Sequence, residues 1–250
     1  MSVLRTAVVF LVIGLAIGIF AGTFINPAPR PQLVSVKFVL DWAISGPQAP
    51  FIVALEKGYF AQEGLAVTMD RGYGSADAVT KVASGVYQLG YGSLDVLIEF
   101  NAKNPGQELV AVYMVLNSPP YSVLTLKNKG INSPKDLEGK KIGAPEGDAP
   151  RRLFPVFAKA TVSMTPALRE PSLVQGEVDA ITGFYYSGYL NLLALKVNPD
   201  DVVAFKYKDY GVELYGNAII AKKEFIEKNP DVVAKFVKAV NRAFKEVLSD

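Results

Sequence analysis

The chain has 250 residues, half of them hydrophobic, and a formal net charge of +2 with acidic and basic residues interspersed. No block of like charge marks a nucleic-acid surface, so we expect no nucleic-acid partner. The chain contains no Cys and no His, which excludes disulfides, thiol nucleophiles, Cys- or His-ligated zinc and iron, and Ser-His-Asp catalysis. Carboxylates remain available for a hard cation or for acid–base work, but no pair stands out. We therefore expect no catalytic residue, no metal and no cofactor.

The N-terminal segment 6–25 (TAVVFLVIGLAIGIFAGTFI) is uncharged and follows Arg5. A helix of that length spans a bilayer core, whereas a secretory signal peptide usually has a shorter apolar stretch and a small-x-small cleavage site. The best such site, 21–23 (AGT), is a poor one. The segment is therefore predicted to be an uncleaved signal anchor, with a cleaved signal peptide as the alternative. Arg5 on the cytoplasmic side would place the rest of the chain outside.

The first half of the remaining chain alternates predicted strands and helices. Apolar and β-branched runs predict strands at 33–40, 65–70, 87–92 and 108–116. Helical spacing, cap residues and glycine stops predict helices at 49–64, 75–85 and 93–103. This alternation is typical of a mostly parallel sheet covered by helices.

The second half repeats this order of elements. The predicted strands are 121–127, 140–145, 178–184, 202–207 and 215–223, and the predicted helices are 133–139, 148–160, 165–177, 185–195 and 230–250. A glycine pattern supports the repeat, because Gly85 and Gly92 bracket a short apolar strand at the same separation as Gly176 and Gly183.

Two similar α/β units with two crossings between them predict a two-lobed clamp. Residues 1–32 form the signal anchor or signal peptide with a Pro-rich spacer. Residues 33–117 and 213–250 form lobe 1, and residues 118–212 form lobe 2. The strands at 121–127 and 215–223 follow the two crossings and are expected to enter the other lobe.

Loops at the ends of the predicted strands indicate where a ligand would bind. Ligands of open α/β sheets bind beyond the carboxyl ends of the strands, where aromatic faces suit flat rings and helix-start amides suit carbonyl or anionic oxygens. The residues predicted on this ground to contact a ligand are Trp42, Gly74, Ser75, Ser93, Ser118, Tyr121, Glu146, Asp148, Thr182, Phe184, Tyr185 and Tyr210.

These residues also have purely structural interpretations. The structural interpretation of Trp42 is a cover of the core, and that of Ser75 and Ser93 is helix capping. Glu146 and Asp148 are equally suited to a solvated loop or to capping the helix that follows.

Four stretches of the chain, 40–67, 72–97, 133–160 and 169–187, resemble the substrate-binding proteins of ABC importers for alkanesulfonate, nitrate, riboflavin and thiamine-precursor pyrimidines. Three strings, LDW followed by EKGYFAQEGL, SPKDLEGKKIG and GEVDAITGF, are jointly specific to that family and not to one ligand. The resemblance implies an α/β, two-lobed type II periplasmic-binding-protein fold whose lobes close on a ligand and then dock on a membrane permease. It also adds Gln48 to the predicted ligand contacts, at the place where the pyrimidine branch often has a His.

The resemblance implies an extracytoplasmic, monomeric solute-binding component of an ABC importer, and not an enzyme. Its ligand would be a thiamine-precursor pyrimidine, a riboflavin-like heterocycle or an alkanesulfonate. One alternative is the thiamine-pyrimidine synthase of the same family, which is disfavoured because its active-site His and Cys-rich iron site have no counterpart here. The other is a membrane-anchored ligand-sensing ectodomain.

The chain departs from the family pattern in two further places. Lobe 2 looks short around 160–164, where one strand is expected to be shortened, and the chain stops at Asp250 inside a predicted helix where family members continue. We expect either a fragment or a compact variant.

Overall fold

The computed structural model describes residues 32–154 and 162–249. The chain divides into two units, Met1–Gln32 and Leu33–Asp250, and the fold described below belongs to the second unit. The predicted signal anchor at 6–25 lies outside the described residues. Within the part that is described, no helix is long and apolar enough to cross a membrane.

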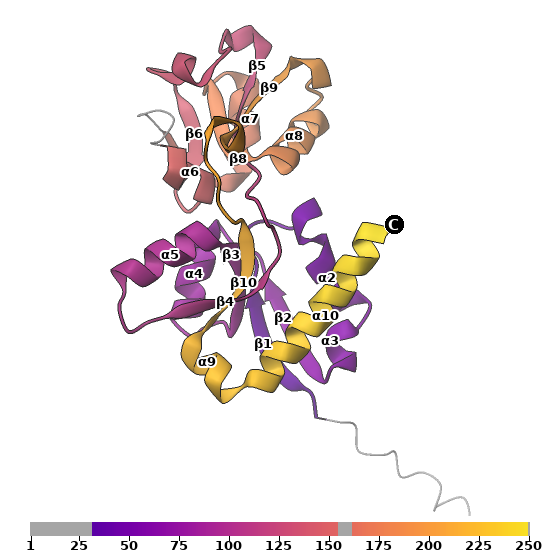
Figure 1. The fold of residues 1–250 in the computed structure, drawn as a ribbon. Coiled ribbons are helices and arrows are strands. Elements are labelled where there is room, and N and C mark those ends of the chain that lie inside the picture. The colour runs from indigo at the N-terminus through magenta and orange to yellow at the C-terminus, as the bar shows by residue number, and fades with distance from the viewer. Residues whose placement is uncertain (1–31, 155–161, 250) are drawn as a thin grey trace, which may run out of the picture. The chain divides into compact units, whose positions relative to one another are not determined.

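The first sheet has five strands in the order β2-β1-β3-β10-β4 (Figure 1). Its strands are β1 (Val34–Val39), β2 (Leu65–Asp70), β3 (Leu89–Ser93), β4 (Leu109–Met114) and β10 (Asn217–Lys222). β1 pairs in parallel with β2 and β3, whereas β10 is antiparallel to both β3 and β4. The strand expected to return after the second crossing therefore lies inside the sheet built by the first half of the chain.

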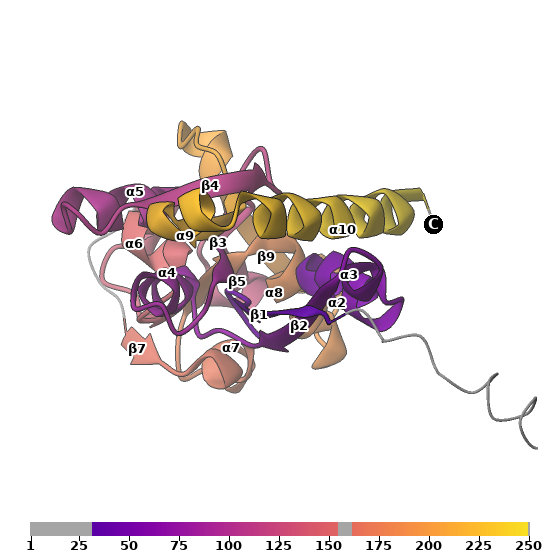
Figure 2. The ribbon, with the colours of Figure 1, turned by 90° about the horizontal axis from the view of Figure 1, so that it is seen from below.

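Helices cover both faces of this sheet, and with it they are called lobe 1 here. One face carries α2 (Ala49–Glu56), α3 (Tyr59–Gln62) and α10 (Pro230–Ser249), and Figure 2 shows α10 lying along α2 and α3. The other face carries α4 (Ser75–Ala83) and α5 (Leu94–Lys103), while α9 (Lys223–Lys228) follows β10. Because side chains alternate along a strand, Ile219 packs into the core under α2 and α10, and Ile220 into the core under α4.

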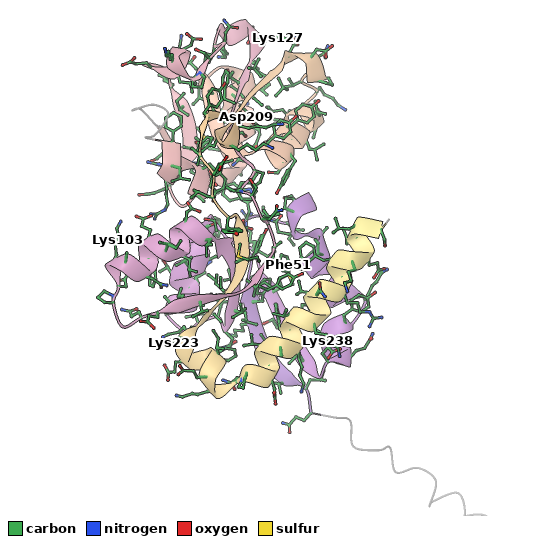
Figure 3. The ribbon with its side chains drawn as sticks, in the orientation of Figure 1. Phe51, Lys103, Lys127, Asp209, Lys223 and Lys238 are labelled. Atoms are coloured by element: carbon green, nitrogen blue, oxygen red, sulfur yellow. The ribbon has the colours of Figure 1, made fainter. Side chains whose placement is uncertain are left out.

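Aromatic rings fill the core between the first sheet and α10. Phe51, which Figure 3 labels, is fully buried, and its ring centroid lies 5.1 Å from that of Phe38 and 4.9 Å from that of Tyr91. Phe60 stacks on Phe236 of α10 at 4.8 Å. Packed rings of this kind bury large apolar areas, so α10 is bound to the sheet through its buried stripe.

The second sheet has the order β7-β6-β8-β5-β9. Its strands are β5 (Tyr121–Leu126), β6 (Ile142–Pro145), β7 (Val162–Met164), β8 (Ala180–Phe184) and β9 (Val202–Lys206). The accompanying helices are α6 (Ala149–Leu153), α7 (Arg169–Gln175) and α8 (Tyr185–Ala194), and this sheet with its helices is called lobe 2. β5 is antiparallel to β8 and β9, just as β10 is antiparallel to β3 and β4.

The two sheets thus have the same plan, which confirms the predicted repeat. β3 and β8 each hold the central position of a sheet, and Gly92 and Gly183 are each the fourth residue of their strand. The residue boundaries between the lobes, at 117/118 and 212/213, stay a prediction, because Leu33–Asp250 forms one compact unit.

Some predicted helices differ from the structure. The helix expected at 49–64 is two helices, because Gly58 adopts a φ of +68° and ends the first of them. The segment expected at 133–139 is a 3₁₀ turn, Pro134–Leu137, capped by Ser133 as predicted. The predicted helix 165–177 begins as a 3₁₀ turn, Pro166–Leu168, before α7.

Other differences concern short elements. The helix α9 was not predicted, and the strand expected to be shortened near 160–164 is β7, with three residues. The predicted helix 148–160 is described only as α6, since 155–161 lie outside the described residues. Further 3₁₀ turns are Gly46–Gln48, Lys127–Lys129, Pro199–Asp201 and Tyr207–Tyr210.

Candidate functional site

One cavity is lined by residues of both lobes. Lobe 1 contributes Asp41, Trp42, Ser45, Pro47, Gln48, Gly74 and Ser75, and lobe 2 contributes Asp148, Arg169, Phe184 and Ser187. The space among these side chains, counting the solvent at its mouth, is about 340 Å³. The two lobes approach each other closely around it.

Backbone atoms of the two lobes meet beside the cavity at Gly74 and Gly147. The amide of Ala76, in the first turn of α4, donates a hydrogen bond of 3.3 Å to the carbonyl oxygen of Gly147 in lobe 2. A Cβ on Gly74 would lie 2.1 Å from that same oxygen, and Gly74 has a φ of +123°. A side chain at this position would therefore prevent the observed contact between the lobes.

Asp41 lies just beyond β1 and is almost fully buried, with 4% of its surface exposed. Its carboxylate accepts hydrogen bonds from Gln48 Nε2 at 2.8 Å and from Asn217 Nδ2 at 2.7 Å. Gln48 is fixed in turn, because its Oε1 accepts from the backbone and hydroxyl of Ser45. Both donors to Asp41 are neutral amides, so burial dominates and raises the pKa of Asp41 to about 6.

The lobe 2 wall carries a buried charge cluster around Arg169, which is 2% exposed at the start of α7. Its Nη2 donates to Glu170 Oε1 at 2.7 Å, and its Nη1 lies 3.6 Å from Asp148 Oδ2. Burial raises the pKa of Asp148 to about 7 against the opposing effect of Arg169, and the charges of Asp41 and Glu170 raise it further. Arg169 therefore compensates Asp148 only in part.

Arg169 also touches lobe 1. Its guanidinium carbon lies 4.9 Å from the ring centroid of Trp42, within cation–π range. Gly183 in β8 makes room for it, because a Cβ there would lie 2.9 Å from Arg169 Nη1. The aromatic side of the cavity continues with Phe184, whose ring centroid is 5.6 Å from that of Tyr121 and 6.2 Å from that of Tyr186.

The structure brings together about half of the residues that the sequence predicted as ligand contacts. The cavity is lined by six of them: Trp42, Gln48, Gly74, Ser75, Asp148 and Phe184. Three more are buried just behind the wall. The backbone N–H of Ser93 donates to Ser75 Oγ at 3.1 Å, Thr182 Oγ1 donates to Asp148 Oδ2 at 3.5 Å, and Tyr121 packs on Phe184.

The remaining four predicted residues lie away from the cavity wall. Ser118, Glu146 and Tyr210 are exposed. Tyr185 stacks on Tyr189 at 5.8 Å, and Lys206 Nζ lies 4.1 Å from its ring centroid. Because neighbouring residues of a helix point in different directions, α8 turns Tyr185 away and places its neighbour Tyr186 beside Phe184.

The structure also shows whether Ser75, Ser93 and Asp148 act as helix caps. The helix α4 starts at Ser75 with Gly74 as its N-cap, and Ser93 is the N-cap of α5 without a side-chain cap bond. Asp148 is the N-cap residue of α6, but its carboxylate accepts no cap hydrogen bond, and the residue lines the cavity.

Sequence reasoning missed five lining residues: Asp41, Ser45, Pro47, Arg169 and Ser187. Asp41 directly precedes Trp42, so its place in the chain was a usable signal. Arg169 gave none, because charged residues are mostly exposed and this one opens a helix rather than following a strand. Within residues 32–154 and 162–249, no group of three or more His, Cys, Asp or Glu is placed to hold a metal ion.

The raised pKa values of Asp41 and Asp148 predict how stability changes with pH. Both groups bind protons more tightly in the folded chain than at their ordinary value of 3.8. The folded state therefore binds more protons than the unfolded state, so their contribution to stability falls as pH rises from about 4 to about 7. We expect Asp148→Asn to flatten this fall, measured as the free energy of unfolding in urea at several pH values.

The matched control is Glu146→Gln, which removes an exposed carboxylate two residues earlier on the same loop. It should leave the pH profile unchanged. A profile of Asp148→Asn that parallels the unaltered protein would show that Asp148 titrates normally.

The amino-acid sequence of the chain is similar to those of known proteins. Residues 47–250 match the family model "NMT1/THI5 like". A formylaminopyrimidine-binding protein of Halalkalibacterium halodurans is 28% identical, over 92% of this chain and 72% of that protein. A 4-amino-5-hydroxymethyl-2-methylpyrimidine phosphate synthase of Schizosaccharomyces pombe is 26% identical, over 86% of this chain and 66% of that protein.

Solved structures show the same fold. The alkanesulfonate-binding protein of Xanthomonas axonopodis pv. citri superposes with a TM-score of 0.66 at 15% identity, covering 86% of this chain and 74% of that one. The periplasmic nitrate-binding protein of Synechocystis superposes with a TM-score of 0.62 at 14% identity, covering 86% and 62%. The expected periplasmic-binding-protein fold is thus confirmed, and the match over 47–250 shows that this chain belongs to the NMT1/THI5-like family.

Proposed function

We propose that the chain is the solute-binding component of an importer, which captures a small organic solute between its lobes and delivers it to a membrane permease. The observation that carries the proposal is the cavity itself. Its wall is shared by two lobes whose sheets have the same plan, and the backbones of Gly74 and Gly147 meet beside it. A site built in this way can enclose a ligand when the lobes meet and release it when they part.

The cavity wall suits a flat heterocycle. Trp42 and Phe184 supply aromatic faces, while Gln48, Ser75 and Asp148 supply polar groups. Similarity to a formylaminopyrimidine-binding protein supports a pyrimidine as the ligand. Similarity in fold to alkanesulfonate- and nitrate-binding proteins supports the wider class of small-solute carriers.

The enzyme hypothesis has less support. Relatives named as pyrimidine phosphate synthases match this chain, but the chain has no His and no Cys, which leaves carboxylates as the titrating groups of the cavity at neutral pH. The proposed location is outside the cytoplasm beside a permease, which the periplasmic nitrate-binding protein that shares the fold supports.

A thermal-shift screen tests the proposed function. A ligand that binds the folded chain raises its melting temperature by mass action. The panel should contain 4-amino-5-hydroxymethyl-2-methylpyrimidine, a formylaminopyrimidine, riboflavin, ethanesulfonate and nitrate. We expect a pyrimidine to raise the melting temperature, and no response to any of these solutes would contradict the proposal.

Removing the Trp42 ring should weaken the binding of a heterocycle. We expect Trp42→Ala to reduce the binding free energy by about 1–3 kcal/mol, by analogy with base–aromatic stacking, measured by titration calorimetry. Trp42→Phe should retain most of the affinity because it keeps an aromatic face. Tyr210→Ala removes an exposed ring outside the cavity and should have no effect. Unchanged affinity in Trp42→Ala would exclude the stacking role.

A further inference from the structure

We propose that the cavity selects a nitrogen heterocycle that binds as a cation through N–H donors, and that it rejects sulfonate and nitrate anions. This inference rests on the proposed function of the same cavity and names the class of its ligand.

Buried negative charge around the cavity exceeds buried positive charge. Three carboxylates, Asp41, Asp148 and Glu170, are 4–5% exposed. Among the described residues, the guanidinium of Arg169 is the cation within ion-pair distance of two of them, Asp148 and Glu170. Arg169 lies closer to Glu170, at 2.7 Å, than to Asp148, at 3.6 Å. Asp41 forms no ion pair among the described residues and is bound by neutral amides. An anion entering this cavity would add to an uncompensated negative charge, and a cation would compensate it.

Hydrogen-bonding groups around Asp41 also favour a ligand that donates. In the described part of the chain, two buried side-chain polar atoms lack a hydrogen-bond partner, Asn217 Oδ1 and Tyr91 Oη. Asn217 donates to Asp41 through its other amide atom, and the negative charge of Asp41 contributes, after burial, to the raised pKa of Tyr91. Asn217 Oδ1 thus leaves one acceptor beside Asp41 without a donor, whereas the neutral Tyr91 hydroxyl can donate as well as accept. Asp41 is the member of this group that lines the cavity, and its carboxylate only accepts hydrogen bonds, so a ligand that brings N–H groups suits it.

The other titratable groups near the carboxylates do not change the balance. Burial raises the pKa of Tyr91, Tyr121, Tyr186 and Tyr207, so these hydroxyls stay neutral. The exposed Arg71 lines a neighbouring pocket together with Glu170, and its guanidinium carbon lies 4.7 Å from the ring centroid of Tyr73. Solvent screens the charge of an exposed group far more than that of a buried one.

A planar pair of N–H donors suits the carboxylates and aromatic rings of the cavity. The carboxylates of Asp41 and Asp148 come from opposite lobes and line the same cavity, with Trp42 and Phe184 beside them. A protonated aminopyrimidine presents a ring N–H and a neighbouring amino N–H in one plane. That planar pair matches the two oxygens of a carboxylate, as a guanidinium does, and the ring offers a face to the aromatic side chains. When such a ring enters as the neutral base, the proton held by Asp148 moves to the ring nitrogen, which leaves carboxylate and cation paired.

A matched ligand series tests the inference on the unaltered protein. Calorimetry should compare 4-amino-5-hydroxymethyl-2-methylpyrimidine with its 4-oxo analogue, which has the same size but lacks the amino donor and the basic ring. Ethanesulfonate and nitrate are the anionic probes. We expect the amino compound to bind about 10- to 100-fold more tightly than the oxo compound, and the anions to show no binding.

The possible outcomes separate this inference from the proposed function. Equal affinity for the amino and oxo compounds overturns the inference, and so does binding of ethanesulfonate, nitrate or riboflavin in preference to the aminopyrimidine. In each of these cases the chain is still a solute-binding protein. A failure of every compound to bind overturns the proposed function together with the inference.

A variant assigns the selectivity to Asp148. Asp148→Asn keeps the shape of the side chain and removes its charge, so we expect the amino-over-oxo preference to fall by about 10-fold or more. Glu146→Gln removes a charge from the same loop outside the cavity and should keep the preference. A retained preference in a folded Asp148→Asn protein overturns the role of Asp148. If that variant does not fold, the ligand series on the unaltered protein still decides the inference.

Discussion

Replacing Arg169 by Met is expected to lower the free energy of unfolding by about 3–5 kcal/mol at pH 7.5, because it leaves buried carboxylates without their cation. Asp148 and Glu170 are each 5% exposed, and both lie within salt-bridge distance of the Arg169 guanidinium. Denaturation in urea measures the loss. It should shrink at pH 5, where Asp148, with its pKa raised to about 7, takes up a proton and no longer needs compensation.

Two variants control for the loss of Arg169. Arg169→Lys keeps the positive charge and should recover part of the stability, though a lysine cannot reproduce the planar donors or the stack on Trp42. Arg71→Met removes an exposed arginine at the same side of the molecule and should change stability by less than about 0.5 kcal/mol. A loss below 1 kcal/mol in Arg169→Met would mean that the charge cluster is hydrated in solution.

The second large effect is expected from Gly74→Ala, which should weaken ligand binding by about 100-fold or more. The added methyl would lie 2.1 Å from the carbonyl oxygen of Gly147. The carbonyl oxygen is a backbone atom and the new Cβ is bonded directly to the backbone, so neither can move aside as a flexible side chain would. The free-energy cost of bringing the lobes together therefore reaches the upper end of the range for overpacking, about 3 kcal/mol. The cost arises only when the lobes meet, so calorimetric affinity is the measurement that reports it.

The backbone angle of Gly74 requires its own control, since a φ of +123° is strained for alanine. Gly85→Ala places a methyl at a φ of +81° with no atom within 4 Å, so it should lower stability without changing affinity. Gly147→Ala approaches the same contact from lobe 2, where its Cβ would lie 2.8 Å from the carbonyl oxygen of Tyr73. It should also weaken binding, and normal affinity in both Gly74→Ala and Gly147→Ala would mean that the bound state does not use this contact.

Much of the architecture was predictable because it depends on local patterns. Apolar strands and glycine stops fixed the order of elements, and the paired glycines at 85/92 and 176/183 indicated that β3 and β8 hold equivalent places. The division of the predicted helix 49–64 was missed, since Gly58 could be recognised as a stop but not as a left-handed residue with a further helix after it.

The residues of the candidate site were predictable only where they lie at the end of a strand in the sequence. Trp42 and Phe184 lie where two strands end, and the structure places both on the cavity. Arg169 reaches the cavity because packing of α7 against lobe 2 carries it there, which no local pattern reveals. The choice between Tyr185 and Tyr186 depends on the rotation of α8, because one residue along a helix turns a side chain by about 100°.

The position of β10 has a consequence for the order in which the protein is made. This strand is fully paired inside the first sheet, between β3 and β4, yet its residues 217–222 follow all of β5 to β9 in the chain. The second sheet, continuous from Tyr121 to Lys206, is therefore complete on the ribosome while the first sheet still lacks an inner strand. The lobe that is synthesised first is finished last, and during that interval the edges of β3 and β4 are open to other strands, which chaperones would have to protect.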